Sequence, residues 1–264
     1  MKKIGGIFTR SSEKIIECEI SSNLGAKIGD SLIVETDLGI EFGRLRYITG
    51  QKISKSFGKI VRVAKKLDSE VVKKEKVEEA KIFESTLIKI KKHGLPMKLI
   101  AVRLSFDRRN LIFYFTAETR VDFRSLLKDL VATYHKLIRL QQIGPRDEAK
   151  FLGKVGICGR NLCCRSFLHE INSITMDLAR DQNLEGVTSS KISGVCGKLM
   201  CCLNYELYLY KMLAKNLPKI GDEIRTKKGK GRVINLNVIA GKVLVELPNG
   251  EKEEIFIPIQ SKKS

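Results

Sequence analysis

The sequence contains no tryptophan, and aromatic residues make up only 6% of its 264 residues. A surface on which the bases of a single-stranded nucleic acid stack needs exposed aromatic side chains, so such a surface is poorly supported. No run of 18 apolar residues occurs, and residues 1–10 lack the uninterrupted apolar core of a secretory signal. We therefore expect a cytoplasmic protein without membrane insertion.

Catalytic patterns are also missing. The cysteines never occur as C-x-x-C, the pair that a dithiol oxidoreductase needs. No base, nucleophile and orienting group stand together in a recognisable arrangement. We therefore predict that the chain is not an enzyme.

Cysteine is concentrated in two short motifs. Both follow the pattern G-x-C-G-[RK]-x-x-C-C, at residues 156–164 and 194–202, and together they hold six of the seven cysteines. Cysteines that only fill a core occur singly, at positions set by strand or helix period. A reducing compartment disfavours disulfides, and a disulfide between adjacent cysteines is strained. Thiolate ligation of a metal or cluster is the leading interpretation, with Cys158, Cys163, Cys164, Cys196, Cys201 and Cys202 as the predicted ligands.

The spacing inside each motif favours an iron–sulfur cluster over zinc. A structural zinc knuckle typically uses C-x₂-C, whereas here four residues separate the first cysteine from a doubled cysteine. C-x₄-C also occurs in plant-type ferredoxins. Adjacent helical residues diverge by about 100°, so the two cysteines of a pair need not serve one site. His169 fits an exposed helix residue better than a ligand, and Cys18 lies in an alternating strand that gives it a core role.

Each Cys-Cys pair is expected where a glycine-containing turn enters a helix. Residues 203–213 are clearly helical in pattern, and residues 165–171 are compatible with a helix. The N–H groups and the positive dipole end at a helix start stabilise a bound, negatively charged thiolate site. The glycines let the backbone approach closely enough to donate hydrogen bonds to sulfur.

The rest of the chain predicts an α+β protein in four parts. Residues 1–60 alternate apolar and polar positions between glycines, which is typical of a small β-module. Residues 61–150 form a central α-β-β-α-β domain, with a helix at 65–92, strands at 98–106 and 111–117, a helix at 121–134 and a strand at 136–142. Residues 151–217 form the cysteine-rich helical segment, and residues 218–264 form an SH3-like module with a hairpin turn at Pro248-Asn249-Gly250. Small β-barrel-like modules therefore flank the central domain at both ends.

The formal charge of +19 suggests a polyanionic partner such as RNA. The excess of Lys and Arg is spread along the chain, without a basic tail or a single patch. A compositional bias of the source produces the same excess equally well. We expect at most a weak, salt-sensitive contact with RNA.

Five segments together resemble the bacterial YaaT/RicT family, namely residues 115–118, 120–124, 142–150, 158–164 and 191–202. The resemblance implies a cytosolic, non-catalytic regulatory adaptor that joins two small helical partners, RicA-like and RicF-like, in a complex carrying [4Fe–4S] clusters. It further implies action with the endoribonuclease RNase Y in mRNA processing, with effects on sporulation, competence and biofilm formation. All six motif cysteines match the family pattern. Residues 154–157 depart from it, because relatives more usually have a glycine-rich stretch ending in proline there.

The number of thiols determines whether the chain could bind two clusters by itself. Two [4Fe–4S] clusters bound only by cysteine need about eight thiolates, whereas the motifs supply six. Partner subunits or ligands other than cysteine must supply the rest, and we expect clusters shared with partners. A zinc-stabilised RNA-binding protein is the alternative function.

Overall fold

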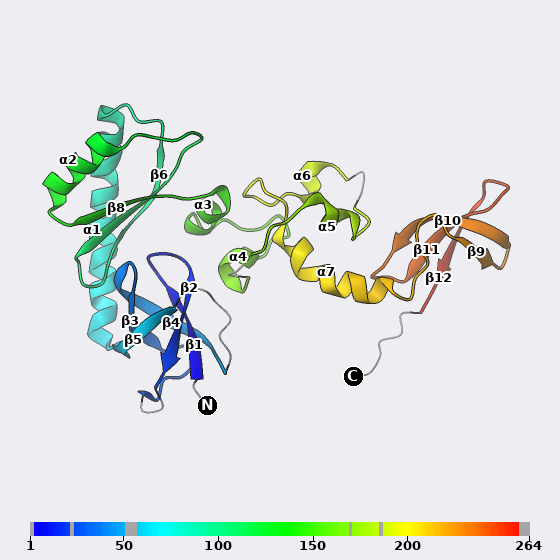
Figure 1. Cartoon of the computed structure of the whole chain (residues 1–264), viewed down its shortest axis with the longest axis horizontal. Helices are drawn as coiled ribbons and strands as arrows, with labels where there is room; N and C mark the ends of the chain where they lie inside the picture. Colours follow the sequence, from blue (N-terminus) through cyan, green and yellow to red (C-terminus); the bar gives the residue numbers. More distant parts are fainter. Residues whose placement is uncertain (1–2, 22–23, 51–56, 169–170, 185–186, 259–264) are drawn as a thin grey trace. The chain divides into compact units, whose positions relative to one another are not determined.

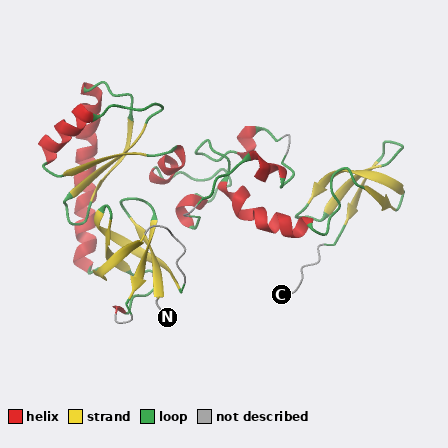
Figure 2. Ribbon diagram, in the orientation of Figure 1, coloured by secondary structure: helices red, strands yellow, loops and turns green. Residues whose placement is uncertain are grey.

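The computed structural model describes residues 3–21, 24–50, 57–168, 171–184 and 187–258 (Figure 1). The chain divides into two compact units, Met1–Glu170 and Ile171–Ser264. Both contain helices and strands, so the α+β class predicted from the sequence is confirmed (Figure 2). None of the described helices is both long and apolar enough to span a bilayer.

The N-terminal strands form a closed barrel in the order β1-β2-β5-β3-β4. Its strands are β1 Lys3–Thr9, β2 Ile15–Ile20, β3 Ser31–Thr36, β4 Gly39–Thr49 and β5 Phe57–Val63. All the pairings are antiparallel except a short parallel one between β2 and β5, which closes the barrel. Cys18 lies fully buried in the barrel core, and burial raises the pKa of its thiol to about 11. The core role predicted for Cys18 is confirmed.

The central domain has the predicted α-β-β-α-β order, and its boundaries lie within about three residues of those expected from the sequence. Its elements are α1 Lys66–Lys92, β6 Lys98–Leu104, β7 Asn110–Thr116, α2 Arg124–Tyr134 and β8 Leu137–Gln142. β7 is the middle strand, antiparallel to β6 and parallel to β8. Helices α1 and α2 supply Ile82, Ile90, Leu126 and Leu130 to the core on one side of this sheet. Residues 111–115 are buried along their whole length, which explains the unbroken apolar run of β7.

Helix α3, Pro145–Phe151, packs beside this sheet and leads to the first cysteine motif. Pro145 opens the helix, and Asp147 and Glu148 lie in its first turn, as the sequence indicated. At its end the Phe151 ring lies 4.6 Å from the Tyr114 ring, measured between centroids. This contact attaches the segment before the first motif to β7.

The described residues of the second unit, 171–184 and 187–258, contain three helices and a C-terminal sheet. The helices are α5 Met176–Arg180, α6 Ser189–Ile192 and α7 Cys201–Ala214, and the strands are β9 Glu223–Thr226, β10 Gly229–Asn237, β11 Lys242–Glu246 and β12 Lys252–Phe256. The helices share a small core of Ala179, Ile192 and Leu203. The strands form an antiparallel meander in the order β9-β10-β11-β12. Small β-barrel-like modules were predicted at both ends; the N-terminal strands form a closed barrel, whereas residues 223–256 form a four-stranded sheet that is not closed.

Candidate functional site

The first cysteine motif folds as a tight hairpin followed by a helix. The Gly156 N–H donates to the Arg160 carbonyl (2.8 Å), and the Gly159 N–H donates to the Gly156 carbonyl (2.9 Å). Gly159 has a φ of +77°, in the left-handed region that favours glycine. Cys158 therefore lies in the turn, and α4, Cys163–Ser166, begins at the second cysteine.

The second cysteine motif repeats this geometry. The Gly194 N–H donates to the Lys198 carbonyl (2.9 Å), and the Gly197 N–H donates to the Gly194 carbonyl (2.9 Å). Gly197 has a φ of +71°. Cys196 lies in the turn, and α7 begins at Cys201. The helix starts predicted at both Cys-Cys pairs are confirmed. The helix considered for residues 165–171 is not found beyond Ser166: residues 167 and 168 are not helical, and residues 169 and 170 lie outside the described residues.

The first glycine of each motif leaves room beside the thiol in the turn. A Cβ atom on Gly156 would lie 3.4 Å from Cys158 Sγ and 3.3 Å from the Arg160 carbonyl oxygen. A Cβ atom on Gly194 would lie 3.6 Å from Cys196 Sγ. The space beside the thiol is tight at Gly156, whereas at Gly194 an added Cβ atom would make only an ordinary contact with the sulfur. Hydrogen bonds from this backbone to sulfur stay a prediction.

The residues that precede the two helices are apolar. Leu162 and Met200 occupy the N-cap positions of α4 and α7 and make no side-chain capping hydrogen bond. N-cap positions usually carry Ser, Thr, Asp or Asn, whose oxygen accepts from a first-turn N–H. Here the polar side chains at the helix start are the thiols themselves.

The six motif cysteines differ in exposure. All are thiols; Cys158 is exposed, Cys164 is only 5% exposed, and the other four are partly exposed. Within the described ranges, no three Cys, His, Asp or Glu side chains gather closely enough to hold a metal ion. The two motifs lie in different compact units, and His169 falls outside the described residues.

The donor chemistry and the hairpins suit a thiophilic metal or cluster, but each motif alone is incomplete. A tetrahedral zinc site or a [4Fe–4S] cluster takes four ligands, whereas each motif contains three thiols. Cys164 is also nearly covered by protein. A zinc ion or [4Fe–4S] cluster held at either motif would therefore need at least one further ligand.

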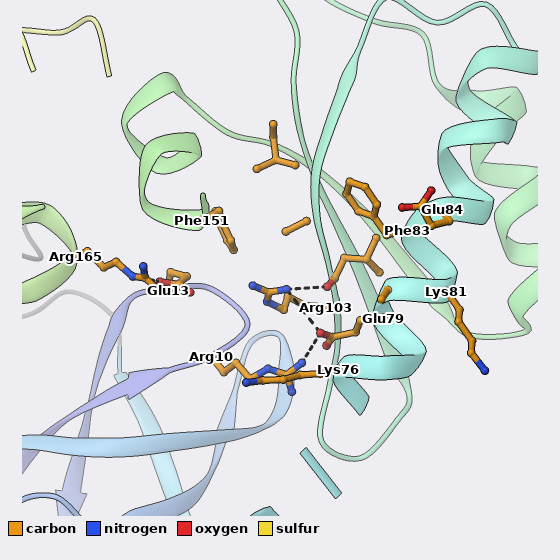
Figure 3. Close-up of a pocket in the computed structure, with 14 residues that line it drawn as sticks. Arg10, Glu13, Lys76, Glu79, Lys81, Phe83, Glu84, Arg103, Phe151 and Arg165 are labelled. Carbon is orange, nitrogen blue, oxygen red and sulfur yellow. Dashed lines mark hydrogen bonds and ion pairs between the residues drawn. The ribbon is translucent and has the colours of Figure 1, made fainter. Parts of the chain in front are cut away.

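Residues far away in the sequence hold the first motif in place. Arg165, directly after the Cys-Cys pair, forms an ion pair with Glu13 of the barrel, with 3.4 Å between Nε and Oε2. Both residues line a cavity of about 720 Å³ together with Arg10, Arg103 and Phe151 (Figure 3). The sequence analysis missed this cavity, because no local pattern relates residues from the barrel, α1, β6 and α3.

The charges in and around the cavity are largely paired with one another. Arg10 forms an ion pair with Glu75 (3.2 Å). Arg10 also forms an ion pair with Glu79, and Arg103 Nη1 lies 3.7 Å from a Glu79 carboxylate oxygen (Figure 3). Burial raises the pKa of Glu75 to about 7, although the nearby Arg10 opposes this shift. These ion pairs join the barrel to α1 and β6. We interpret this region as a structural joint between the barrel and the central domain.

Comparison with known proteins then determines the family. The chain is 44% identical over 225 residues to stage 0 sporulation protein YaaT of Bacillus subtilis, covering 84% of this chain and 82% of that protein. The chain belongs to the YaaT/RicT family. The PSP1 C-terminal conserved region matches residues 58–143 of this family member, and the third domain of PSP1-like proteins matches residues 173–217. The second match contains the second cysteine motif, and the first motif lies between the two matches.

A further relative of this YaaT/RicT family member is more distant. An uncharacterized protein of Schizosaccharomyces pombe is 39% identical over 46 residues, which is 17% of this chain and 6% of that protein. No solved structure matches the chain.

Proposed function

We propose that this chain is a non-catalytic regulatory subunit whose two cysteine hairpins hold [4Fe–4S] clusters together with partner proteins. The repeated hairpin carries the proposal. In two separate units the chain builds the same glycine turn, with one cysteine in the turn and two at a helix start. Two copies of one costly arrangement of reactive thiols are hard to explain by packing alone.

The proposed ligands are Cys158, Cys163 and Cys164 in the first unit and Cys196, Cys201 and Cys202 in the second. Bound there, a cluster would supply reversible one-electron chemistry and a rigid link between subunits. The hairpin would orient the turn cysteine, and the helix start would place N–H groups toward the negatively charged cluster. The missing ligands would come from partners.

The regulatory role rests on the family. The Bacillus subtilis relative is named as a sporulation protein. We propose that the present chain acts in the cytoplasm as an adaptor for RicA-like and RicF-like partners. This complex would control mRNA processing by RNase Y through protein contacts, and thereby sporulation, competence and biofilm programmes where these exist.

Metal analysis of anaerobically purified protein tests the cluster. We expect the isolated chain to contain little iron and sulfide, and both to rise when partner proteins are co-purified. Cys163→Ser and Cys201→Ser should each remove most of the gain at their motif, whereas Cys18→Ser is the control and should leave it unchanged. Stoichiometric zinc without iron or sulfide, retained after attempted cluster reconstitution, would overturn the proposal.

The zinc result would favour the second candidate, a zinc-stabilised RNA-binding protein. Its support is the net charge of +19 and the flanking β-modules. Under the adaptor proposal, RNA binding by the isolated chain should be weak, indifferent to sequence and strongly reduced by salt. Tight binding that survives high salt would favour the second candidate.

A further inference from the structure

The hairpin of β9 and β10, at the start of the C-terminal sheet, carries a local patch of positive charge. Five of the eight residues 225–232 are Lys or Arg, and none is Asp or Glu. Most acidic residues of this sheet lie instead on β11, β12 and the turn between them, namely Glu246, Glu251, Glu253 and Glu254. Charge summed over longer stretches of the sequence hides this patch.

Two of the cations face each other across the hairpin. Arg225 of β9 lies directly opposite Lys230 of β10, and both side chains are exposed. Like charges directly opposite each other destabilise an antiparallel pair. Among the described residues, no carboxylate forms an ion pair with Arg225, Lys230 or Lys227 of the turn. The fold therefore leaves these three positive charges without compensation.

The other two cations of the hairpin have acidic neighbours. Lys228 forms an ion pair with Glu251, with 3.4 Å between Nζ and Oε2. Arg232 lies opposite Glu223 on β9 and opposite Glu246 on β11. The unpaired charge is thus confined to the turn and to the adjoining strand pair.

The N-terminal barrel contains the same turn between β3 and β4. The Thr36 hydroxyl donates to the Gly39 carbonyl, and the Thr226 hydroxyl donates to the Gly229 carbonyl, at 3.0 Å in both cases. In each hairpin this threonine also accepts a hydrogen bond from the N–H group two residues further on. The two hairpins therefore allow a comparison of the same backbone turn with different side chains.

The barrel copy of the turn is used for packing inside the first unit. Its two turn residues are Asp37 and Leu38, and Leu38 packs against the core residues Ile112 and Tyr114 of the central domain. The strand pair that corresponds to Arg225 and Lys230 is Glu35 and Ile40. One copy of the hairpin thus has an apolar turn residue that is partly buried, whereas the other has exposed cations.

The surface of the β9–β10 hairpin suits a polyanion better than a protein surface. Among the described residues, none of the large apolar side chains that are exposed lies in β9 or β10. The centre of a protein interface normally contains aromatic or aliphatic anchors and few charges, whereas phosphate contacts need only cationic side chains and N–H groups. A Cβ atom on Gly229 would meet no neighbour within 4 Å, so the backbone at the turn is open to a ligand.

We infer that the β9–β10 hairpin binds the phosphodiester backbone of RNA through Arg225, Lys227 and Lys230. The choice of RNA rests on the proposed function in mRNA processing. A guanidinium group donates two parallel hydrogen bonds to a phosphate, and a lysine contributes a point charge. A phosphate bound there also offsets the repulsion between Arg225 and Lys230. The hairpin would hold a transcript beside the adaptor without reading its sequence.

The test measures binding of the full chain to a short, labelled oligouridylate over a range of salt concentrations. In Arg225→Ala/Lys230→Ala, the plot of log affinity against log salt should become shallower by about 1.4, because each phosphate contact to a single strand contributes about 0.7. The matched control is Lys191→Ala/Lys215→Ala, which removes the same charge from exposed positions outside the sheet and should leave the slope unchanged. Equal changes in the two variants would mean that net charge alone binds RNA, and would overturn the inference.

A second variant transfers the turn of the barrel to the C-terminal sheet. Lys227→Asp/Lys228→Leu gives this turn the residues that the barrel accommodates at Asp37 and Leu38, so the hairpin should still form. RNA binding at low salt should be weakened, because a cation at the turn is replaced by an anion. Thermal unfolding checks both hairpin variants, and removal of the facing cations should not lower the unfolding midpoint. Unchanged RNA binding by a folded turn variant would overturn the inference.

Other probes distinguish other ligands. Polyglutamate that binds as tightly as RNA at equal charge, and is lost in Arg225→Ala/Lys230→Ala, would identify an acidic protein surface and overturn RNA. A preference of about tenfold or more for oligodeoxythymidylate would do the same in favour of DNA. A chain with iron and sulfide whose RNA binding ignores both hairpin variants refutes this inference but not the cluster. Hairpin-dependent RNA binding by a complex without iron refutes the cluster but not this inference.

Discussion

The two cysteine motifs have the same hairpin but are held in place differently. After the first Cys-Cys pair comes Arg165, which reaches an acidic residue of the barrel. The corresponding residue of the second motif is Leu203, which is buried in an apolar core. Ionic attachment in one case and apolar burial in the other show that the hairpin itself does not depend on a particular neighbour.

The helices that follow the motifs differ as well. α4 ends after four residues, whereas α7 continues for fourteen and exposes the large side chains of Tyr208 and Met212. A helix of four residues offers little surface for docking, because it spans about one turn. The second motif is therefore the one that continues into an extended helix surface.

The largest expected effect concerns Leu203. Leu203→Ala removes a fully packed side chain from a small core and should lower the free energy of unfolding of the second unit by about 2–5 kcal/mol. Urea denaturation, monitored by proteolysis or hydrogen exchange, would show whether the loss of stability lies in the second unit. Leu209→Ala, on the exposed side of the same helix, is the control. Equal losses for the two variants would show that Leu203 is not the anchor of the second motif.

Replacing the turn glycine by alanine should destabilise the hairpin equally in both motifs. Gly159→Ala and Gly197→Ala force a Cβ atom into the left-handed region, at about 1–2 kcal/mol each. Neither glycine has a neighbour within 4 Å of the added atom, so backbone conformation alone should determine the cost. Thermal unfolding and cluster content would measure it. Clearly different costs would mean that the two hairpins are not equivalent.

Arg165 should contribute less to the free energy of unfolding than Leu203. Arg165→Ala breaks a partly exposed ion pair and leaves Glu13 without that partner, which should cost about 1 kcal/mol. Because the pair is ionic, the difference from the unsubstituted chain should decrease as salt is added. When unfolding is measured without guanidinium, Arg165→Lys should recover part of the stability that Arg165→Ala loses. Insensitivity to salt would argue for a packing role instead.

A pH dependence of the stability of the first unit is also expected. Burial raises the pKa of Glu41 and of Glu75 to about 7, from ordinary values of 4.5. Between these values the folded unit binds more protons than the unfolded chain, so the stability that these two carboxyls contribute is fully present below about pH 4.5 and is lost as pH rises through 7. Thermal unfolding of Glu75→Gln should show a flatter pH profile. An unchanged profile would contradict the assignment of Glu75.

The sequence alone determined the local features. These features depend on residues that lie within one or two turns of each other. They are the cysteine spacing, the helix starts at Cys163 and Cys201, the turn glycines and the α-β-β-α-β order. Periodicity and glycine conformation act at that range, so these features could be predicted. The cluster, its partners and the domain limits at residues 60, 150 and 217 stay predictions.

Only the tertiary structure decided how these features are supported. The ion pair of Arg165 with Glu13 and that of Arg10 with Glu75 join residues more than 60 positions apart. The sequence of α7 is apolar nearly all round, so periodicity could not tell the packed side at Leu203 from the exposed side at Tyr208. Closure of the N-terminal barrel through β2 and β5, and the open C-terminal meander, depend on which strand edges meet. Such pairings are set by packing between distant segments, which a local pattern does not encode.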